Sequence, residues 1–206
     1  GACFVAGGWA PFVWAGCWWV SGRSRAAGGG EVDLVTVVFL WTRRITGTNE
    51  QAAALMRTSF TPLVRDIGDL SAAVFDTRGQ MLAQATTGTP GHINSLASGM
   101  RHFLARFPRA TLEPGDVLIT NDPWMTSGQL NDISIVTPVF HGGKLVGFFG
   151  NPCHAIDLGG IGLTANGHDA HEEGLQIPLA TPHTGSGPTQ TPLGATPSNV
   201  PPPPQP

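Results

Sequence analysis

The sequence has few charged residues and few cysteines, and each shortage excludes a class of protein. Only 12% of the 206 residues are charged, and the net charge of −3 comes with no basic stripe interleaved with aromatic residues. Nucleic acid is therefore not an expected partner. Cys3, Cys17 and Cys153 show no C-x-x-C spacing. This excludes a disulfide framework or a zinc ribbon and favours a reducing compartment, which we take to be the cytoplasm.

The sequence also lacks a phosphate-binding loop and an uninterrupted apolar span. No strand-like run precedes G-x-x-x-x-G-K-[ST] or G-x-G-x-x-G, the glycine-rich motifs that cradle nucleotide phosphates. The apolar run from Phe4 to Val20 is broken by proline and glycine, and its nearest arginines, Arg23 and Arg25, follow it instead of preceding it. It therefore matches neither a signal peptide nor a membrane helix, and no membrane association is expected.

Glycine and proline, with 28 and 18 residues, gather at the two ends of the chain. Residues 1–32 include the glycine string "AAGGGE" near their end and are interpreted as a linker or a segment outside the domain. Residues 181–206 end in "VPPPPQP" and contain almost no apolar residues, which predicts a disordered, proline-rich tail. The foldable part is therefore expected to be 33–180, the length of one domain.

This middle part has both helical and strand patterns. Leu34–Thr58, with "NEQAAALMRTSF", and the segment "INSLASGMRHFLARF" space their apolar residues as amphipathic helices do. Between them, Asp76–Gly79 lie between two apolar runs and predict a hairpin turn. Three more strands are expected, at Val117–Thr120, Ile133–Phe140 and Leu145–Gly150. The order predicts an α+β fold with amphipathic helices packed on a mixed or antiparallel sheet, between disordered or non-native ends.

Polar residues that could form a site fall in the loops between these elements. Asn121 and Asp122 precede a proline, Gln129 and Asp132 lie three positions apart, and His92 comes just before a helix, where it could act as a general base. Ordinary structural roles remain open for all of them: an Asx turn, a cap or solvated acid, and a ring packed in a loop.

The pair His154 and Asp157 offers an imidazole and a carboxylate three positions apart. These groups suit Zn, Mn or Fe, whereas an amide oxygen such as that of Gln129 is a weaker ligand. The alternative is a histidine held by a neighbouring backbone carbonyl, with Cys153 beside it simply buried. Spacing alone does not decide between these two interpretations.

Several long motifs in series carry a family resemblance. "NEQAAALMRTSFTPLVRDIGDLSAAVFDTRGQMLAQ", "TPGHINSL", "LEPGDVLITNDPW", "SGQLNDISIVTPVF", "CHAIDLGG" and "EEGLQIP" occur in order between about 33 and 178. Together they resemble the N-terminal part of the hydantoinase B/oxoprolinase family. That family includes the β-subunit of ATP-dependent N-methylhydantoinase, the corresponding half of 5-oxoprolinase and the α-subunits of acetone-type carboxylases. Its members are several times longer, so the chain resembles a truncated fragment.

The resemblance implies a cytoplasmic hetero-oligomeric enzyme. A companion hydantoinase A-like ATPase would bind ATP and Mg and phosphorylate the substrate, and the present chain would complete ring opening of a cyclic amide. In the carboxylase relatives a metal is held by the histidine and aspartate of a G-H-L-x-D loop and by a histidine of H-H-x-D-I-G-G. Carried over, these positions are Gln129, Asp132 and His154, so one histidine is replaced and a divalent Mn, Zn or Fe would bind more weakly. His92, Asn121 and Asp122 match family motif positions and are expected to be catalytic.

Two alternatives to the hydrolase stay open. One is the α-type subunit of an acetone- or acetophenone-like ATP-dependent carboxylase, which the substitution at Gln129 disfavours. The other is an inactive fragment that serves only in assembly, because a family pocket also takes residues from parts that this chain lacks. On either interpretation the fragment alone is expected to be inactive.

Overall fold

The computed structural model describes residues 34–161, 164, 166–184 and 187–188. Its contacts divide the chain into two units, 1–42 and 43–206. The interpretation of 1–32 as a linker falls outside the described residues, as do Cys3 and Cys17. The hydrophobic core lies within the second unit.

The described residues form an α+β fold, as the sequence predicts. The helical elements are α2 (Leu34–Thr58), the short turn η1 (Leu63–Ile67), α3 (Pro90–Arg106) and the short turn η2 (Arg109–Thr111). The strands are β1 (Ala73–Phe75), β2 (Met81–Gln84), β3 (Val117–Thr120), β4 (Asp132–His141), β5 (Lys144–His154), β6 (Ala180–Thr184) and β7 (Gly187–Pro188). The predicted bounds of α2 and β3 are confirmed at both ends.

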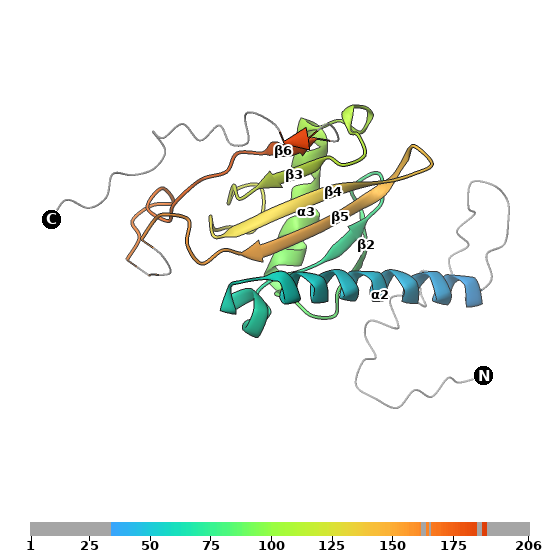
Figure 1. The fold of residues 1–206 in the computed structure, drawn as a ribbon, viewed down its shortest axis with the longest axis horizontal. Coiled ribbons are helices and arrows are strands. Elements are labelled where there is room, and N and C mark those ends of the chain that lie inside the picture. The colour runs from blue at the N-terminus through green and yellow to red at the C-terminus, as the bar shows by residue number, and fades with distance from the viewer. Residues whose placement is uncertain (1–33, 162–163, 165, 185–186, 189–206) are drawn as a thin grey trace. The chain divides into compact units, whose positions relative to one another are not determined.

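Within the described part of the chain, the strands form one seven-stranded sheet in the order β2-β1-β5-β4-β3-β6-β7. All paired neighbours are antiparallel, which settles the mixed-or-antiparallel expectation. The long hairpin of β4 and β5 lies at its centre, and Figure 1 shows the start of β4 and the end of β5 at the same edge of the sheet. Side chains at that edge therefore come from two strands that the hairpin holds in register.

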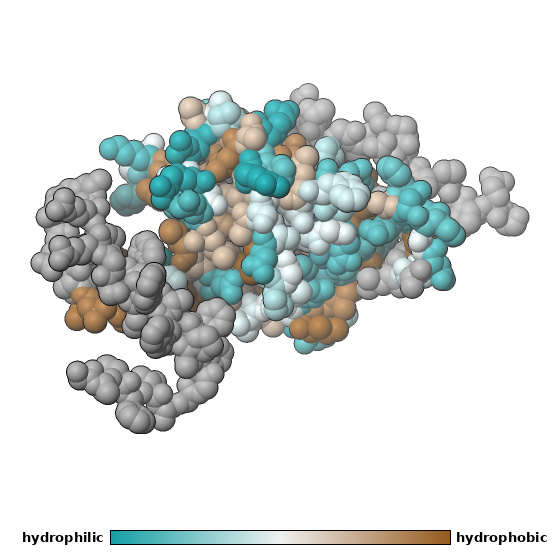
Figure 2. Space-filling model, turned by 180° about the vertical axis from the view of Figure 1, so that it is seen from behind, coloured by the Kyte–Doolittle hydropathy of each residue, from teal (hydrophilic) through white to brown (hydrophobic). Residues whose placement is uncertain are grey.

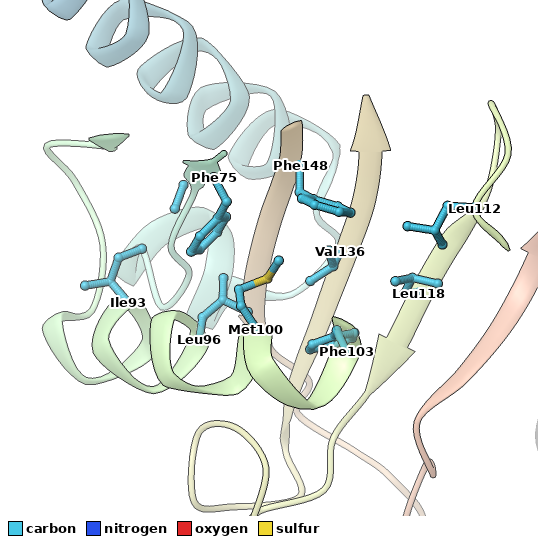
Figure 3. Close-up of a cluster of buried hydrophobic side chains, with 10 residues drawn as sticks. Phe75, Ile93, Leu96, Met100, Phe103, Leu112, Leu118, Val136 and Phe148 are labelled. Carbon is cyan, nitrogen blue, oxygen red and sulfur yellow. The ribbon is translucent and has the colours of Figure 1, made fainter. Parts of the chain in front are cut away.

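The helix α3 packs on one face of this sheet and supplies four of the ten buried residues of the main core. Its apolar residues recur every three or four positions, so they form one stripe that meets the strands. In Figure 3, Leu96, Met100 and Phe103 of α3 lie against Phe75, Val136 and Phe148 of the sheet. The core residues are almost fully buried, and each large one contributes about 1.5–3 kcal/mol of hydrophobic stabilisation.

A second apolar cluster joins the later part of α2 to the segments beside β1. Ala52 is buried here with Val64 of η1 and with Leu70, and Cys153 of β5 packs against the same cluster. Cys153 is a free cysteine that is partly buried, in agreement with its interpretation as a packing residue. Burial and the nearby carboxylates of Asp132 and Asp69 raise the pKa of its thiol, so it stays protonated.

Two strand ends differ from the expectations. β5 continues four residues beyond Gly150 to His154, because Asn151 and Pro152 interrupt the apolar pattern without ending the pairing with β4. The first residues of the segment predicted as a tail from residue 181 also belong to a strand, since β6 pairs with β3. Backbone hydrogen bonds hold β6 and do not require the apolar side chains that the segment lacks. Residues 189–206 lie outside the described part.

The surface of the described residues is mostly hydrophilic in the view of Figure 2, with separate apolar patches. Phe60, Ile67 and Trp124 are the most exposed large apolar side chains of the second unit. None of the described helices combines the length and the apolar character needed to cross a bilayer.

Gly150 is expected to be essential to the packing of α3 on β5. A methyl group there would lie 2.8 Å from Cδ2 of Leu96 and 2.9 Å from Cε2 of Phe75, both in the fully packed core. We expect Gly150→Ala to lower the free energy of unfolding by about 1–3 kcal/mol in chemical denaturation of the 206-residue chain. The control Gly47→Ala places its methyl in open space within α2 and is expected to stabilise by up to about 1 kcal/mol. Equal stability of Gly150→Ala and wild type would contradict this packing.

Candidate functional site

The candidate site is built around the carboxylate of Asp132, the first residue of β4. Its side chain is almost completely buried, with 1% of the residue exposed. One oxygen, Oδ1, lies 2.9 Å from Nδ1 of His154, and the other, Oδ2, lies 2.9 Å from Nε2 of His92. Gln129 donates a third hydrogen bond from Nε2 to Oδ2, at 3.1 Å. A buried carboxylate is thus shared by two imidazoles and an amide.

His154 reaches Asp132 because the two residues face each other across the central hairpin. They are register partners at the end of β5 and the start of β4. Just beyond this pair, Asn131 and Ala155 exchange two bonds, Ala155 N to Asn131 O at 2.7 Å and Asn131 Nδ2 to Ala155 O at 2.7 Å. The hairpin ends are therefore held together, and the sequence-based view of two separate loops is replaced by one strand pair.

His92 enters from the start of α3. Pro90 occupies the first turn, where its missing N–H costs nothing, so the helix begins close to the strand ends. The preceding residue, Thr89, stands at the N-cap but makes no capping bond with its side chain. Instead Thr89 Oγ1 donates to Oδ1 of Asp69 at 2.7 Å. The Thr89 hydroxyl, which at an N-cap would ordinarily bond to the backbone of the helix, thus holds the carboxylate of Asp69.

Asp69 is a site residue that sequence reasoning missed. It follows Gly68, whose φ of 77° ends the turn η1, and its backbone oxygen accepts from His154 N at 3.1 Å. Its carboxylate lies 3.6 Å from Nε2 of His92 and 3.6 Å from Nδ1 of His154. We call Asp69, His92, Asp132 and His154 the His–Asp cluster. Asp69 sits far from its partners in the sequence, and the polar residue after glycine in "DIGDLS" was its only signal.

The charges of the cluster reinforce one another. Burial disfavours a charged imidazole, but the hydrogen bond and charge of Asp132, with the charge of Asp69, outweigh it and raise the pKa of His92. Burial likewise disfavours the Asp132 carboxylate, but hydrogen bonds from His92, Gln129 and His154 and the charge of His92 lower its pKa. Both shifts favour a buried ion pair between His92 and Asp132.

Asn121 and Asp122 lie in the same region but bind backbone groups. Asn121 is fully buried; its Nδ2 donates to the carbonyls of Leu130 and Leu175, and its Oδ1 accepts from Ile177 N. Asp122 Oδ1 accepts from Trp124 N at 2.9 Å, which makes the Asx turn that its position before Pro123 suggests. Asn121 therefore connects three backbone segments, and the hydrogen bonds of its side chain go to these segments instead of the cluster.

Asp157 is also separate from the cluster. Its Oδ1 accepts from Gly159 N at 2.7 Å in an exposed turn. The motif His154-x-x-Asp157 therefore does not form one site in this structure. The partner of His154 is Asp132, which is distant in the sequence but adjacent in the sheet.

The chemistry of the cluster fits a divalent cation in its donor types. Two imidazole nitrogens and two carboxylates face one another, and these are the usual ligands of Zn, Mn and Fe. In the structure, however, the cluster is closed by its own hydrogen bonds. Across the residues that the structure describes, no three His, Cys, Asp or Glu side chains are arranged as a ready-made metal site. A cation would have to replace protons that the histidines share with Asp132.

Comparison with known proteins identifies relatives for most of the chain. The family model described as hydantoinase B/oxoprolinase matches residues 33–185. An uncharacterized protein of Methanocaldococcus jannaschii is 30% identical over 152 residues, which cover 71% of this chain and 27% of the relative. The 5-oxoprolinase of Saccharomyces cerevisiae is 33% identical over 151 residues, with coverage of 71% and 12%. The chain thus spans about a quarter or less of the length of these relatives.

Two solved structures share the fold. The nucleotide-free structure of acetone carboxylase superimposes with a TM-score of 0.64 at 21% identity and covers 74% of this chain and 21% of its own. The ATP-dependent caprolactamase of Pseudomonas jessenii gives a TM-score of 0.62 at 23% identity, with coverage of 77% and 28%. At these identities the likeness establishes the fold.

Asn121 is expected to be a structural cross-link. Asn121→Ala would leave two carbonyls and one N–H without their partner, so we expect it to lower the free energy of unfolding by about 2–4 kcal/mol. Asn94→Ala, at an exposed position of α3, is the matched control and is expected to change stability little. Chemical denaturation of both variants measures the difference. If Asn121→Ala were as stable as the control, Asn121 would return to the candidate catalytic residues.

Proposed function

Because the chain belongs to the hydantoinase B/oxoprolinase family, we propose that it forms part of an ATP-dependent cyclic-amide hydrolase, in the component that completes ring opening. ATP and Mg are bound by a companion ATPase, which phosphorylates the amide oxygen and so makes the amide carbon electrophilic. Water adds to that carbon, the ring C–N bond breaks as the nitrogen takes up a proton, and hydrolysis of the resulting acyl phosphate releases phosphate. The absence of a glycine-rich phosphate loop from the sequence is in keeping with this division of work. So is a relative from a Pseudomonas species whose name describes it as one subunit of a D-/L-hydantoinase.

The His–Asp cluster is the observation that carries this proposal. It gathers two histidines and two aspartates from a helix, a turn and two strands, with His92 and His154 each only 4% exposed. Nδ1 of His92 and Nε2 of His154 have no hydrogen-bond partner among the described residues. Buried polar groups without partners are rare in a purely structural cluster and common in sites that bind something else.

The residues of the cluster have separable parts in this chemistry. Asp132 orients both imidazoles by accepting from one nitrogen of each, and Gln129 steadies Asp132 from the preceding loop. The cluster would hold a divalent cation through His92, Asp132, His154 and Asp69, and such a cation would polarise the bond that water attacks. Gln129 faces the cluster with its amide nitrogen, so it serves Asp132 and is not counted as a ligand.

The residue at position 129 distinguishes the proposed hydrolase function from the carboxylase alternative. The carboxylase relatives are expected to carry a histidine where this chain carries Gln129. Without that ligand, the cation is held by fewer imidazoles and bound more weakly. The hydrolase therefore remains the favoured function, in which the metal would assist the attack of water on an amide carbon that the companion ATPase has already activated.

Metal binding tests the role of the cluster. We expect Mn²⁺ to bind the 206-residue chain weakly and Gln129→His to bind it about tenfold or more tightly, because an imidazole joins the cluster. Isothermal titration with elemental analysis measures both. Gln80→His adds a histidine at the distant β1–β2 turn and is the control, while Asp132→Asn is expected to abolish binding. If Gln129→His and Gln80→His bind Mn²⁺ equally, or if Asp132→Asn binds as wild type does, the cluster is not the metal site.

Turnover tests the hydrolase. Residues 33–185 of this chain replace the matching segment of the hydantoinase relative from Pseudomonas, and the resulting chimera is combined with the companion ATPase of that enzyme. We expect the chimera to open the hydantoin ring only when both ATP and the companion are present. We expect Asp132→Asn to reduce the rate of ring opening by about a hundredfold or more. The variant Val146→Lys, on the exposed side of β5, is the control and is expected to retain activity. Ring opening without ATP would contradict the proposal, and ATP-dependent uptake of bicarbonate into a ketone would establish the carboxylase instead.

A further inference from the structure

A hollow of about 460 Å³ opens beside the His–Asp cluster. It lies between the turn η1 and the segment that leads into α3, and it is lined by Met56, Asp66, Ile67, Gly68, Leu70, Thr87, Gly88, Thr89 and Pro90. Its volume falls within the range of about 300–1,000 Å³ that small-molecule sites occupy.

The hollow and the cluster share a wall. Gly68 and Leu70, which line the hollow, are the chain neighbours of Asp69, and Thr89 lines the hollow while its hydroxyl donates to Asp69. Pro90, at the edge of the hollow, precedes His92 by two residues in the first turn of α3. A ligand in the hollow is therefore placed next to the groups that would act on its amide.

The lining of the hollow combines apolar side chains with backbone and hydroxyl groups. Met56, Ile67 and Leu70 are its apolar members, and Ile67 is 73% exposed. Apolar side chains with a few polar groups among them are the usual lining of small-molecule sites, so the exposed Ile67 offers a hydrocarbon contact to a ligand. Thr87 and Thr89 offer hydroxyl groups that could meet a ring amide.

The charge around the hollow is negative. Asp66 lines it, and Asp69 lies directly behind its wall, whereas no lysine or arginine stands among the described residues that form the lining. Arg65, the chain neighbour of Asp66, binds its carboxylate through Nε at 2.8 Å, and both side chains are exposed. In the metal-free chain, a ring that carries its own carboxylate would meet the like charges of Asp66 and Asp69, and no lysine or arginine of the described lining would pair with it.

We propose that this hollow binds the hydrocarbon face of the cyclic amide and selects rings without a carboxylate. The inference rests on the proposed function and narrows it to uncharged lactams or hydantoins, as opposed to 5-oxoproline. Ile67 is the specificity-determining residue of this lining, and the partly buried Met56 offers an apolar surface to the ring carbons.

Three ligands on one ring separate charge from size. 2-Pyrrolidone is the bare ring, 5-oxoproline adds a carboxylate, and 5-oxoprolinamide adds an uncharged group of nearly the same size. Binding to the 206-residue chain is followed by amide and methyl NMR shifts in the presence of a chelator, because a bound cation would offset the charge of Asp69. We expect shifts at Met56, Ile67 and Leu70, with 5-oxoproline bound about tenfold or more weakly than its amide.

A positive charge added at Ile67 provides the matched variant. Ile67→Lys changes an exposed side chain and leaves the cluster intact, so we expect it to strengthen 5-oxoproline binding about tenfold and to weaken 2-pyrrolidone. Val146→Lys adds the same charge at another exposed apolar position, 51% exposed on β5, and is expected to change neither affinity.

Three outcomes of these binding experiments would overturn the inference. If 5-oxoproline binds wild type as tightly as 5-oxoprolinamide does, the hollow does not select against the carboxylate. If Ile67→Lys and Val146→Lys act alike, or if no ring binds, the hollow is not the ring site. Mn²⁺ binding and ATP-dependent turnover are measured separately, so they can hold while the inference fails; if they fail while the rings still bind at the hollow, only the proposed function is lost.

Discussion

The buried charge of Asp132 is the constraint on which the site depends. Removing a carboxylate from water costs several kcal/mol unless charged or polar partners surround it. Its three partners come from three different elements: His92 from the start of α3, His154 from the end of β5, and Gln129 from the loop before β4. The ends of these elements must therefore meet at one edge of the sheet. The structure secures this with the exchange of hydrogen bonds between Asn131 and Ala155 and with the placement of Pro90 in the first turn of α3.

The same arrangement leaves unpaired groups that a purely structural cluster would not tolerate. Each imidazole uses one nitrogen on Asp132, and the second nitrogens of His92 and His154 are buried without a partner within the described part of the chain. Ser134, two positions along β4 from Asp132, has a buried hydroxyl in the same condition. Buried polar atoms are nearly always bonded in folded proteins, so these atoms support the binding role that we propose for the cluster. A functional cluster explains them better than a packing role does.

The sequence predicts the scaffold well and the site only in part, for a physical reason. Helical periodicity gives both ends of α2, and the turn Asp76–Gly79 gives the β1–β2 hairpin, because these signals are local. The pairing of His154 with Asp132 depends on the register of β4 and β5 over ten residue pairs. Pro152 interrupts the strand pattern in the sequence, so the end of β5 is not predicted as a strand. Asp69 joins through a backbone bond to His154 and a hydroxyl from Thr89, contacts that leave no spacing in the sequence. The family resemblance supplied Asp132 and His154 but placed His92 in a separate catalytic role, whereas the structure brings it onto the same carboxylate.

The division between cluster and hollow also explains how such a site can change its substrate. The cluster residues on Asp132 are buried and mutually dependent, so a change in one leaves an uncompensated charge and costs several kcal/mol. The hollow is bounded instead by the turn η1 and by Thr87–Pro90, and its outermost side chain, Ile67, is mostly exposed. Substitutions of exposed side chains usually change stability by less than about 0.5 kcal/mol. In the proposed site, ring selection could therefore vary at Ile67 while the cluster stays fixed, because stability constrains the two parts to very different degrees.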